Sequence, residues 1–214
     1  MNLLGRFVLM QLLLLLTNMR HTVLLFTGHL LDSIDRISAR FPYRLISEVR
    51  RLIATEVNHF QDPDATQIAI SSLAAGSDIL FAEEVIQSGV PLHVFLPYSA
   101  REFVQRSVVY TKNHPDEGPD GWINRFSDCI EQAASVNKAK VADGIDPYAA
   151  CNKEMLEYAL AFSGHHKSKI RALAMMESGS EIKVGGAAEF ADEIELAGIQ
   201  VKRMWPYRPH RLYR

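Results

Sequence analysis

The chain has very few cysteines, and their placement excludes the simplest cysteine-based chemistries. Its 214 residues include only Cys129 and Cys151, which are not spaced as metal ligands. Two such cysteines are typical of a reducing compartment, so we expect both thiols to pack as small apolar groups in a cytoplasmic protein. His165 and His166 are the only adjacent histidines, and they lack cysteine or carboxylate partners at ligand spacing. No metal site is therefore predicted.

Strong charge and the commonest nucleotide-binding or hydrolase motifs are also missing. The formal net charge is −2 at pH 7, which gives no reason to expect a nucleic-acid duplex as a partner. No Gly-x-Gly-x-x-Gly follows the first apolar run, and the chain contains neither Gly-Lys-Ser/Thr nor Gly-x-Ser-x-Gly. These absences argue against an ordinary dehydrogenase, a P-loop NTPase and a serine hydrolase.

The chain also lacks an apolar run long enough for a comfortable membrane span. Residues 3–16 are strongly apolar, but Arg6 and Gln11 interrupt them, and a transmembrane helix needs about 20 apolar residues. No small-x-small cleavage site of a signal peptide precedes Met19, which would itself be a natural start. We therefore expect residues 1–18 to be an accessory helix or an over-extended start, and we favour both over a membrane anchor.

Short apolar runs alternate with amphipathic segments along the rest of the chain. The length suits one sizeable core, so residues 19–214 are predicted to form a single domain. The alternation predicts an α/β fold, namely a Rossmann-like, doubly wound, mostly parallel sheet with helices on both faces. Such sheets bind ligands beyond the carboxyl ends of their strands. The predicted strands cover residues 23–26, 67–71, 92–96, 136–141, 170–175 and 199–204.

Residues 69–84 are predicted to be a strand that leads directly into a helix, with small residues at the junction. Ala75 and Gly76 allow backbone N–H groups to approach a ligand, and the helix N-terminus favours anions. Ser77 can donate a hydrogen bond to a phosphate, so we predict that a phosphate-bearing small molecule binds here. Asp78 can border the ligand or simply stabilise the positive end of the helix, and Gly76 can equally serve only to pack the helix against the sheet.

Further binding candidates follow the first and third strands. Gly28 allows a ligand close to the backbone, and His29 can contact a phosphate or a ribose or have a structural role. Asp32 and Arg36 lie in the next loop, where Arg36 can hold a phosphate in bidentate fashion or form a loop salt bridge. Pro97 ends the third strand. We expect these residues to meet at the carboxyl edge of the sheet.

Five short segments occur in one order along the chain. They are Phe-Thr-Gly-His at 26–29, Arg-Phe-Pro at 40–42, Ser-Leu-Ala-Ala-Gly-Ser-Asp at 72–78, Phe-Leu-Pro at 95–97 and Gly-Gly-Ala at 185–187. Together they resemble the SLOG superfamily, which unites the Smf/DprA-type and lysine-decarboxylase-like "Lonely guy" Rossmannoid proteins. The similarity runs from about residue 23 to about residue 206. It implies a site for a nucleotide or nucleotide derivative, because many relatives are thought to sense NAD-derived or oligonucleotide signals in bacterial defence and signalling.

Other relatives hydrolyse nucleotide N-glycosidic bonds. Their motif is Pro-Gly-Gly-x-Gly-Thr-x-x-Glu, in which the glycines hold phosphate and the glutamate acts at the glycosidic bond. This chain keeps Gly185 and Gly186, followed by Ala187, and these three residues are predicted to bind the ligand. The third glycine is missing, Glu189 replaces the threonine, and Asp192 stands at the position of the glutamate. These departures weaken the case for phosphoribohydrolase activity.

Three functions therefore remain open. The first is a sensor module that binds NAD, ADP-ribose or an oligonucleotide signal, requires no cofactor, and changes its homo-oligomeric state or partner contacts when the ligand arrives. The second is a nucleotide N-glycosidase that uses Glu83, Glu189 or Asp192 as its carboxylate, since a carboxylate can stabilise an oxocarbenium ion. The third is a scaffold with a degenerate pocket.

Two further groups are candidates near the pocket. Trp122, Arg125 and Phe126 can form a lid that stacks a base, although aromatic residues at helical spacing can equally belong to the core. Asn152 lies four residues past Tyr148 and can also reach the pocket.

Overall fold

A computed structural model describes residues 20–33, 36–37, 39–109, 121–177 and 182–206. Six strands form one sheet in the order β4-β3-β2-β1-β5-β6, and every neighbouring pair is parallel. The predicted doubly wound α/β fold is therefore confirmed. The strands are β1 (Arg20–Gly28), β2 (Ala65–Ser71), β3 (Leu92–Leu96), β4 (Ser135–Lys138), β5 (Ile170–Met175) and β6 (Val201–Met204).

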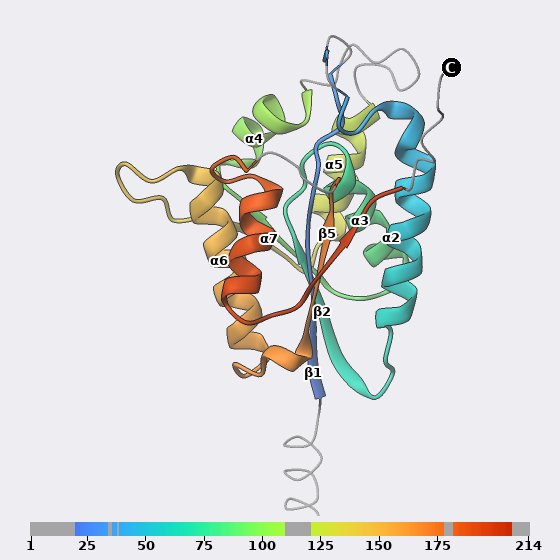
Figure 1. Cartoon of the computed structure of the whole chain (residues 1–214), viewed down its shortest axis with the longest axis vertical. Helices are drawn as coiled ribbons and strands as arrows, with labels where there is room; N and C mark the ends of the chain where they lie inside the picture. Colours follow the sequence, from blue (N-terminus) through green and yellow to red (C-terminus); the bar gives the residue numbers. More distant parts are fainter. Residues whose placement is uncertain (1–19, 34–35, 38, 110–120, 178–181, 207–214) are drawn as a thin grey trace, which may run out of the picture.

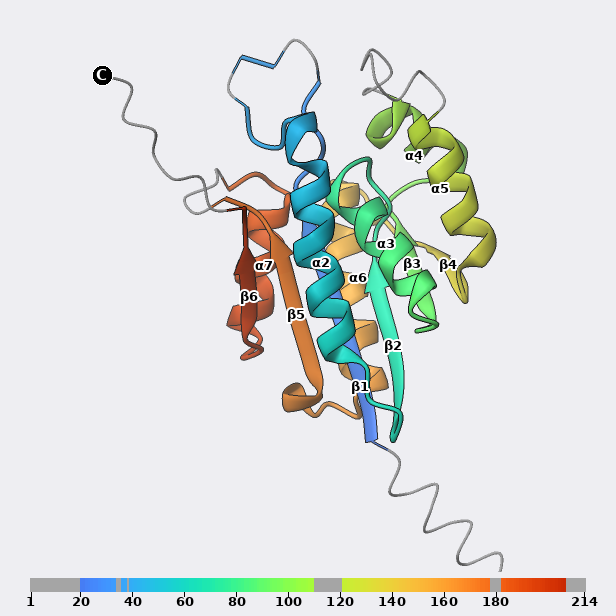
Figure 2. The same cartoon turned by 90° about the vertical axis from the view of Figure 1, so that its right-hand side faces the viewer.

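Helices cover both faces of this sheet (Figures 1 and 2). They are α2 (Ile46–Phe60), α3 (Ser77–Gln87), α4 (Ala100–Ser107), α5 (Gly121–Gln132), α6 (Pro147–Phe162) and α7 (Ala187–Leu196), with short 3-10 helices η1 (Tyr43–Leu45) and η3 (Lys167–Lys169). Helices α2, α3 and α5 pack on one face, whereas α6 and α7 pack on the other. Residues 1–18 lie outside the described residues, so their predicted structure is not tested.

The starts of two helices follow directly from their local sequences. Asp146 caps α6, because its carboxylate accepts hydrogen bonds from the N–H groups of Tyr148 and Ala149. Pro147 occupies the first turn, where a missing N–H costs nothing. Ser99 caps α4 by accepting from the N–H of Glu102, as its spacing predicts. Both helices thus begin beside the carboxyl edge of the sheet.

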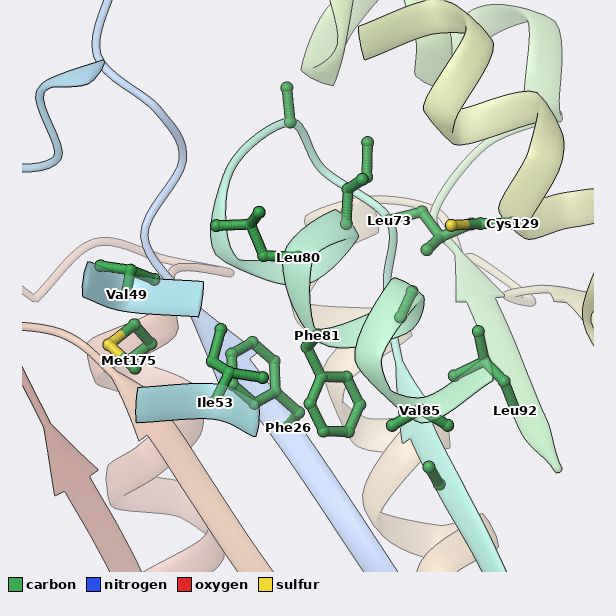
Figure 3. Packing of buried hydrophobic residues seen from close by; sticks show 14 of the residues in the cluster. Phe26, Val49, Ile53, Leu73, Leu80, Phe81, Val85, Leu92, Cys129 and Met175 are labelled. Carbon is green, nitrogen blue, oxygen red and sulfur yellow. The ribbon is translucent and has the colours of Figure 1, made fainter. Parts of the chain in front are cut away.

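The core on the α2 and α3 side is built around stacked aromatic rings (Figure 3). Phe26 of β1 and Phe81 of α3 lie with ring centroids 4.3 Å apart and planes 8° from parallel. Val49 and Ile53 of α2 close over them, and all four side chains are fully buried. Each such side chain contributes about 1.5–3 kcal/mol through burial, so this packing holds β1, α2 and α3 as one unit.

The strand order sets where a ligand can bind. The chain builds outward from β1 through β2 and β3 to β4, and then returns to place β5 on the other side of β1. The segments that follow β1 and β5 therefore diverge onto opposite faces. Open parallel sheets bind ligands in the crevice at such a reversal. Within the described residues, no helix is both long enough and apolar enough to cross a membrane.

Candidate functional site

A cavity of about 160 Å³ lies at the carboxyl ends of β1, β2 and β3. Helices α3 and α4 wall it on one side, and α6 and the start of α7 wall it on the other. Both layers of helices therefore contribute to one site beside the reversal of strand order. The structure brings six of the predicted binding residues to this cavity, namely Gly28, Asp78, Pro97, Gly185, Gly186 and Ala187. Asn152 also lines it.

An aromatic and cationic group at the cavity was not identified from the sequence. The Arg106 guanidinium lies 4.7 Å from the centre of the Tyr98 ring, which in turn meets the Tyr148 ring edge-on at 5.6 Å. The Tyr148 hydroxyl lies 2.9 Å from the Ser107 hydroxyl, which joins α6 to α4 across 41 residues of sequence. One signal was present, since Tyr148 and Asn152 are four residues apart and thus share a helix face.

Ser77 does not present a free hydroxyl to the cavity. Its side chain is fully buried, and its Oγ donates a hydrogen bond of 2.8 Å to the His29 carbonyl, which also accepts from the Ser77 N–H at 3.2 Å. A Cβ on Gly28 would lie only 2.2 Å from this Oγ. Ser77 and Gly28 therefore join the end of β1 to α3. Phosphate binding by Ser77 stays a prediction, and the hydroxyl proton that it would need is already donated to the His29 carbonyl.

Gly76 has a packing role that the structure makes explicit. Its φ of +120° is one that residues with a side chain rarely adopt, and a Cβ there would lie 2.5 Å from the Leu31 nitrogen. The neighbouring Ala75 is fully buried, and its carbonyl accepts from the Leu31 N–H at 2.9 Å. This arrangement supports the alternative in which Gly76 packs the helix closely, and neither Gly76 nor Ala75 is among the described cavity residues.

Asp78 is the one carboxylate among the described residues that line the cavity. Only 8% of the residue is exposed. Its Oδ2 accepts from the Ala74 N–H at 3.3 Å, whereas its buried Oδ1 has no hydrogen-bond partner among the described residues. Burial raises the pKa of Asp78 to about 7, against the opposing effect of the Ala74 hydrogen bond. The carboxyl therefore holds its proton to a much higher pH than an exposed aspartate does.

The predicted binders in the first loop lie away from the cavity. The buried His29 ring meets Trp205 edge-on at 5.7 Å, and burial, followed by the charges of Arg40 and Arg36, lowers the pKa of His29 to about 4. Asp32 accepts from the Arg40 N–H at 2.8 Å and pairs with Arg36 at 3.2 Å. These contacts support the salt-bridge alternative for Arg36. Leu30 of this loop lines the cavity, but His29, Asp32, Arg36 and Arg40 are not among the described lining residues.

The double glycine before α7 packs against the start of α6. Gly185 has a φ of +71°, and a Cβ there would lie 2.4 Å from the Tyr148 Cβ. The Asn152 side chain donates to the Gly185 carbonyl at 3.3 Å. The Gly185 N–H donates to the Glu189 carboxylate at 2.5 Å. An internal carboxylate therefore takes a backbone donor that a ligand phosphate could use at a helix start.

Glu83, predicted as a possible catalytic carboxylate, lies outside the cavity. Its two oxygens accept from Arg125 of α5 at 2.6 and 2.9 Å, and Arg50 of α2 pairs with it as well. Burial opposes ionisation of Glu83, but the two arginines outweigh it and hold the pKa of the carboxyl below its usual range. Glu83 of α3 therefore joins its own helix to α2 and α5.

The two remaining catalytic candidates also have partners within the protein. Glu189 is held by the Gly185 N–H, and Asp192 pairs with Arg203 at 2.6 Å on the protein surface. Neither is among the described residues that line the cavity. The catalytic roles of Glu83, Glu189 and Asp192 stay predictions, and Asp78 is the carboxyl group among the described residues that line the cavity.

The predicted aromatic lid belongs to the core. Trp122 and Phe126 are 3% and 4% exposed, and they pack in the cluster that contains Phe81. The Arg125 guanidinium lies 3.9 Å from the centre of the Trp122 ring. Neither aromatic ring lines the cavity as the structure describes it. The same described ranges contain no group of three or more His, Cys, Asp or Glu side chains arranged to hold a metal ion.

The fold and the cavity together define a class. This is a Rossmann-like α/β protein with a small cavity at the carboxyl edge of a parallel sheet. No family model matches the chain, and none of the curated proteins matches it. The resemblance to the SLOG superfamily therefore stays an expectation that rests on the ordered segments alone.

Proposed function

We propose that this protein binds a nucleotide-derived small molecule in the cavity at the carboxyl edge and acts as a sensor. The supporting observation is the cavity itself, which gathers Gly28, Asp78 and the 185–187 segment beside the reversal of strand order. The candidate ligands are NAD, ADP-ribose and oligonucleotide signals, as the resemblance to SLOG proteins implies. Binding would act through the homo-oligomeric state or through contacts with a partner.

The size of the cavity limits what it encloses. Sites for whole drug-sized ligands measure about 300–1,000 Å³, whereas this cavity measures about 160 Å³. It suits one part of a nucleotide, such as a ribose or a base, with the rest of the ligand outside. Arg106 is the cation among the described lining residues, and its side chain is about half exposed. The ligand phosphates would therefore extend toward Arg106.

The sensor is favoured over the glycosidase by the placement of the carboxylates. A glycosidase needs a carboxylate at the bond that breaks, and Glu83, Glu189 and Asp192 are not among the described residues that line the cavity. Glu83 and Asp192 pair with arginines, and Glu189 accepts from the Gly185 N–H. Hydrolysis would have to use Asp78 alone. The sensor requires only binding.

One experiment separates the three functions. The purified protein is incubated with NAD, ADP-ribose, AMP and cyclic oligonucleotides, and both thermal stability and product formation are measured. Stabilisation by one of these compounds without turnover supports the sensor. Release of a free base supports the glycosidase, and no shift with any compound supports the scaffold and contradicts this proposal.

A matched pair of variants locates the site. Arg106→Gln should weaken binding of the stabilising compound by about tenfold, because a charge-assisted hydrogen bond is worth roughly 1.5 kcal/mol. Arg101→Gln changes an exposed arginine of the same helix that does not line the cavity and should leave binding unchanged. If the two substitutions weakened ligand binding equally, the ligand would not lie in the cavity beside Arg106.

A further inference from the structure

Asp78 has an unusual position for a carboxyl group. It lies in the first turn of α3, directly after β2, with one oxygen hydrogen-bonded to the Ala74 N–H and the other buried without a partner among the described residues. Buried polar atoms nearly always have hydrogen-bond partners, so an exception calls for an explanation. Because Asp78 lines the cavity, the missing donor can come from the molecule that occupies it.

The groups that face Asp78 supply no compensating charge close to it. On α6, the Tyr148 hydroxyl is paired with Ser107, and burial raises the pKa of the Cys151 thiol to about 12. The described lining residues of β1 and of the 185–187 segment are uncharged. Arg106 of α4 is the nearest source of positive charge in the lining, and it is paired with Glu102 at 3.0 Å. A neutral group with hydrogen-bond donors therefore suits Asp78, whereas a phosphate beside it would be repelled.

The starts of α3 and α7 at the cavity are already supplied with a negative group, as the start of α6 is with the capping carboxylate of Asp146. Asp78 lies in the first turn of α3, and the Ser77 hydroxyl is donated to the His29 carbonyl. At the start of α7, Glu189 accepts from the Gly185 N–H. A phosphate at either position would compete with an internal carboxylate, which leaves Arg106 as the favourable place for it.

We infer that Asp78 binds the adjacent hydroxyls of a ribose while the phosphates of the same nucleotide extend toward Arg106. This inference rests on the proposed function and refines it, because it names ribonucleotides as the ligand class. A ribose diol offers two O–H donors to one carboxylate, and carboxylates bind ribose hydroxyls in many Rossmann folds. The expected phosphate site at Gly76 and Ser77 is thereby replaced by a ribose site.

The inference makes selectivity depend on pH. An ionised Asp78 accepts both hydroxyls, whereas a protonated Asp78 accepts fewer hydrogen bonds. Since burial raises the pKa of Asp78 to about 7, its ionised fraction rises between about pH 6 and about pH 8. Preference for a ribose over a 2′-deoxyribose should rise over the same interval.

The test compares AMP with 2′-deoxy-AMP by calorimetry at about pH 6 and about pH 8, with NAD as a second ligand. The wild-type protein should bind AMP about tenfold more tightly than 2′-deoxy-AMP at the higher pH, and less selectively at the lower pH. Both compounds carry the same phosphate, so its titration affects their two dissociation constants equally and does not change the ratio. Asp78→Asn should abolish this ratio, with folding checked by circular dichroism.

Arg106→Gln serves as the second variant. It should weaken the binding of AMP and of 2′-deoxy-AMP by a similar factor and keep the ratio of their dissociation constants. The test therefore does not depend on the folding of Asp78→Asn. Equal binding of AMP and 2′-deoxy-AMP by the wild-type protein would overturn the inference alone, as would binding of NAD without binding of AMP. If AMP, 2′-deoxy-AMP and NAD fail to bind, and ADP-ribose and the cyclic oligonucleotides also give no thermal shift, the proposed function fails as well.

Discussion

At the scale of single residues, burial decides what Asp78 and His29 do. Asp78 is 8% exposed and His29 is 6% exposed, and neither side chain lies in a setting that favours its charged form. The pKa of Asp78 rises to about 7 and that of His29 falls to about 4. Each group therefore makes the stability of the protein depend on pH, in a different interval.

Asp78→Asn should reveal the energetic cost of burying this carboxyl. Below about pH 4 both the folded and the unfolded chain keep the proton, so the cost is absent. Between about pH 4 and about pH 7 only the unfolded chain releases the proton, so the wild-type free energy of unfolding falls by up to about 4 kcal/mol relative to the variant and then levels off. Urea unfolding across this range measures the difference, and a flat difference would contradict the buried, uncompensated state.

His29→Gln should show the opposite dependence in acid. Above about pH 6.5 His29 is neutral in both the folded and the unfolded chain, so its titration does not change the free energy of unfolding. As the pH falls toward about 4, only the unfolded chain takes up the proton, and the wild-type protein should lose up to about 3 kcal/mol relative to the variant. NMR titration of the imidazole in the folded protein provides an independent measurement, and a pKa near the ordinary value would refute this expectation.

At the scale of secondary-structure elements, α3 is joined to its neighbours in two ways. Its first turn is fastened to the end of β1 through Gly76 and Ser77. Its middle is fastened to α2 and α5 through Glu83 and the arginines that flank it. The residues that seemed to mark a phosphate site and a catalytic site are thus largely connections between elements.

Glu83→Gln should affect stability and leave ligand binding unchanged. The substitution removes the negative charge between Arg50 and Arg125, and because Glu83 is about a quarter exposed we expect a loss of about 2 kcal/mol, less than for a fully buried pair. Glu84→Gln is the matched control, since Glu84 pairs with Arg50 alone in the described contacts, and its loss should be smaller. If Glu83→Gln lost ligand binding while its stability stayed unchanged, Glu83 would have a role in the binding site after all.

Gly76→Ala should be far more damaging than a similar change at a glycine without close neighbours. The new Cβ would meet the Leu31 nitrogen at 2.5 Å, so the chain must shift, and we expect a loss of about 3 kcal/mol in chemical denaturation. Gly89 has a φ of +76°, but a Cβ added there would have no neighbouring atom within 4 Å. Gly89→Ala should therefore cost only about 1 kcal/mol of stability, through backbone strain. Similar losses in the two variants would show that close packing at Gly76 is unimportant.

At the scale of the whole molecule, the two helical layers meet over the carboxyl edge of the sheet. Tyr148 of α6 contacts Ser107 of α4, and both line the cavity. A second cavity of about 410 Å³ lies at the opposite edge and is lined by residues such as Asp62 and Lys169. A ligand at the carboxyl edge would therefore connect the layers, whereas one at the amino edge would not.

Hydrogen exchange should locate the ligand between these two edges. Addition of a binding nucleotide should slow exchange in α4 and at the starts of α6 and α7, because these segments line the cavity. Exchange around Asp62 and η3 should stay unchanged. Protection at the amino edge instead would place the ligand in the second cavity and contradict the proposed site.

Much of the fold could be predicted because its signals are local. Short runs of sequence predict all six strands and the Ser99 cap, although β4 ends at Lys138 and β6 begins at Val201, so both are shorter than predicted. Parallel strands align their carboxyl ends by geometry alone. The cavity residues Gly28, Pro97 and Gly185 could be predicted for the same reason, since Gly28 ends β1, Pro97 follows β3 and Gly185 lies two residues before α7.

The sequence by itself determined the alternation of strands and helices, and with it the edge at which a ligand would bind. Only the tertiary structure decided which neighbour at each strand end faces the cavity. Ser77 and Asp78 are consecutive, but a helix turns about 100° per residue, so their side chains point in different directions. The Ser77 hydroxyl therefore donates to the His29 carbonyl, whereas Asp78 lines the cavity. The pairing of Arg106 and Tyr148 at one site is likewise a property of packing, because α4 and α6 meet only when the whole sheet is assembled.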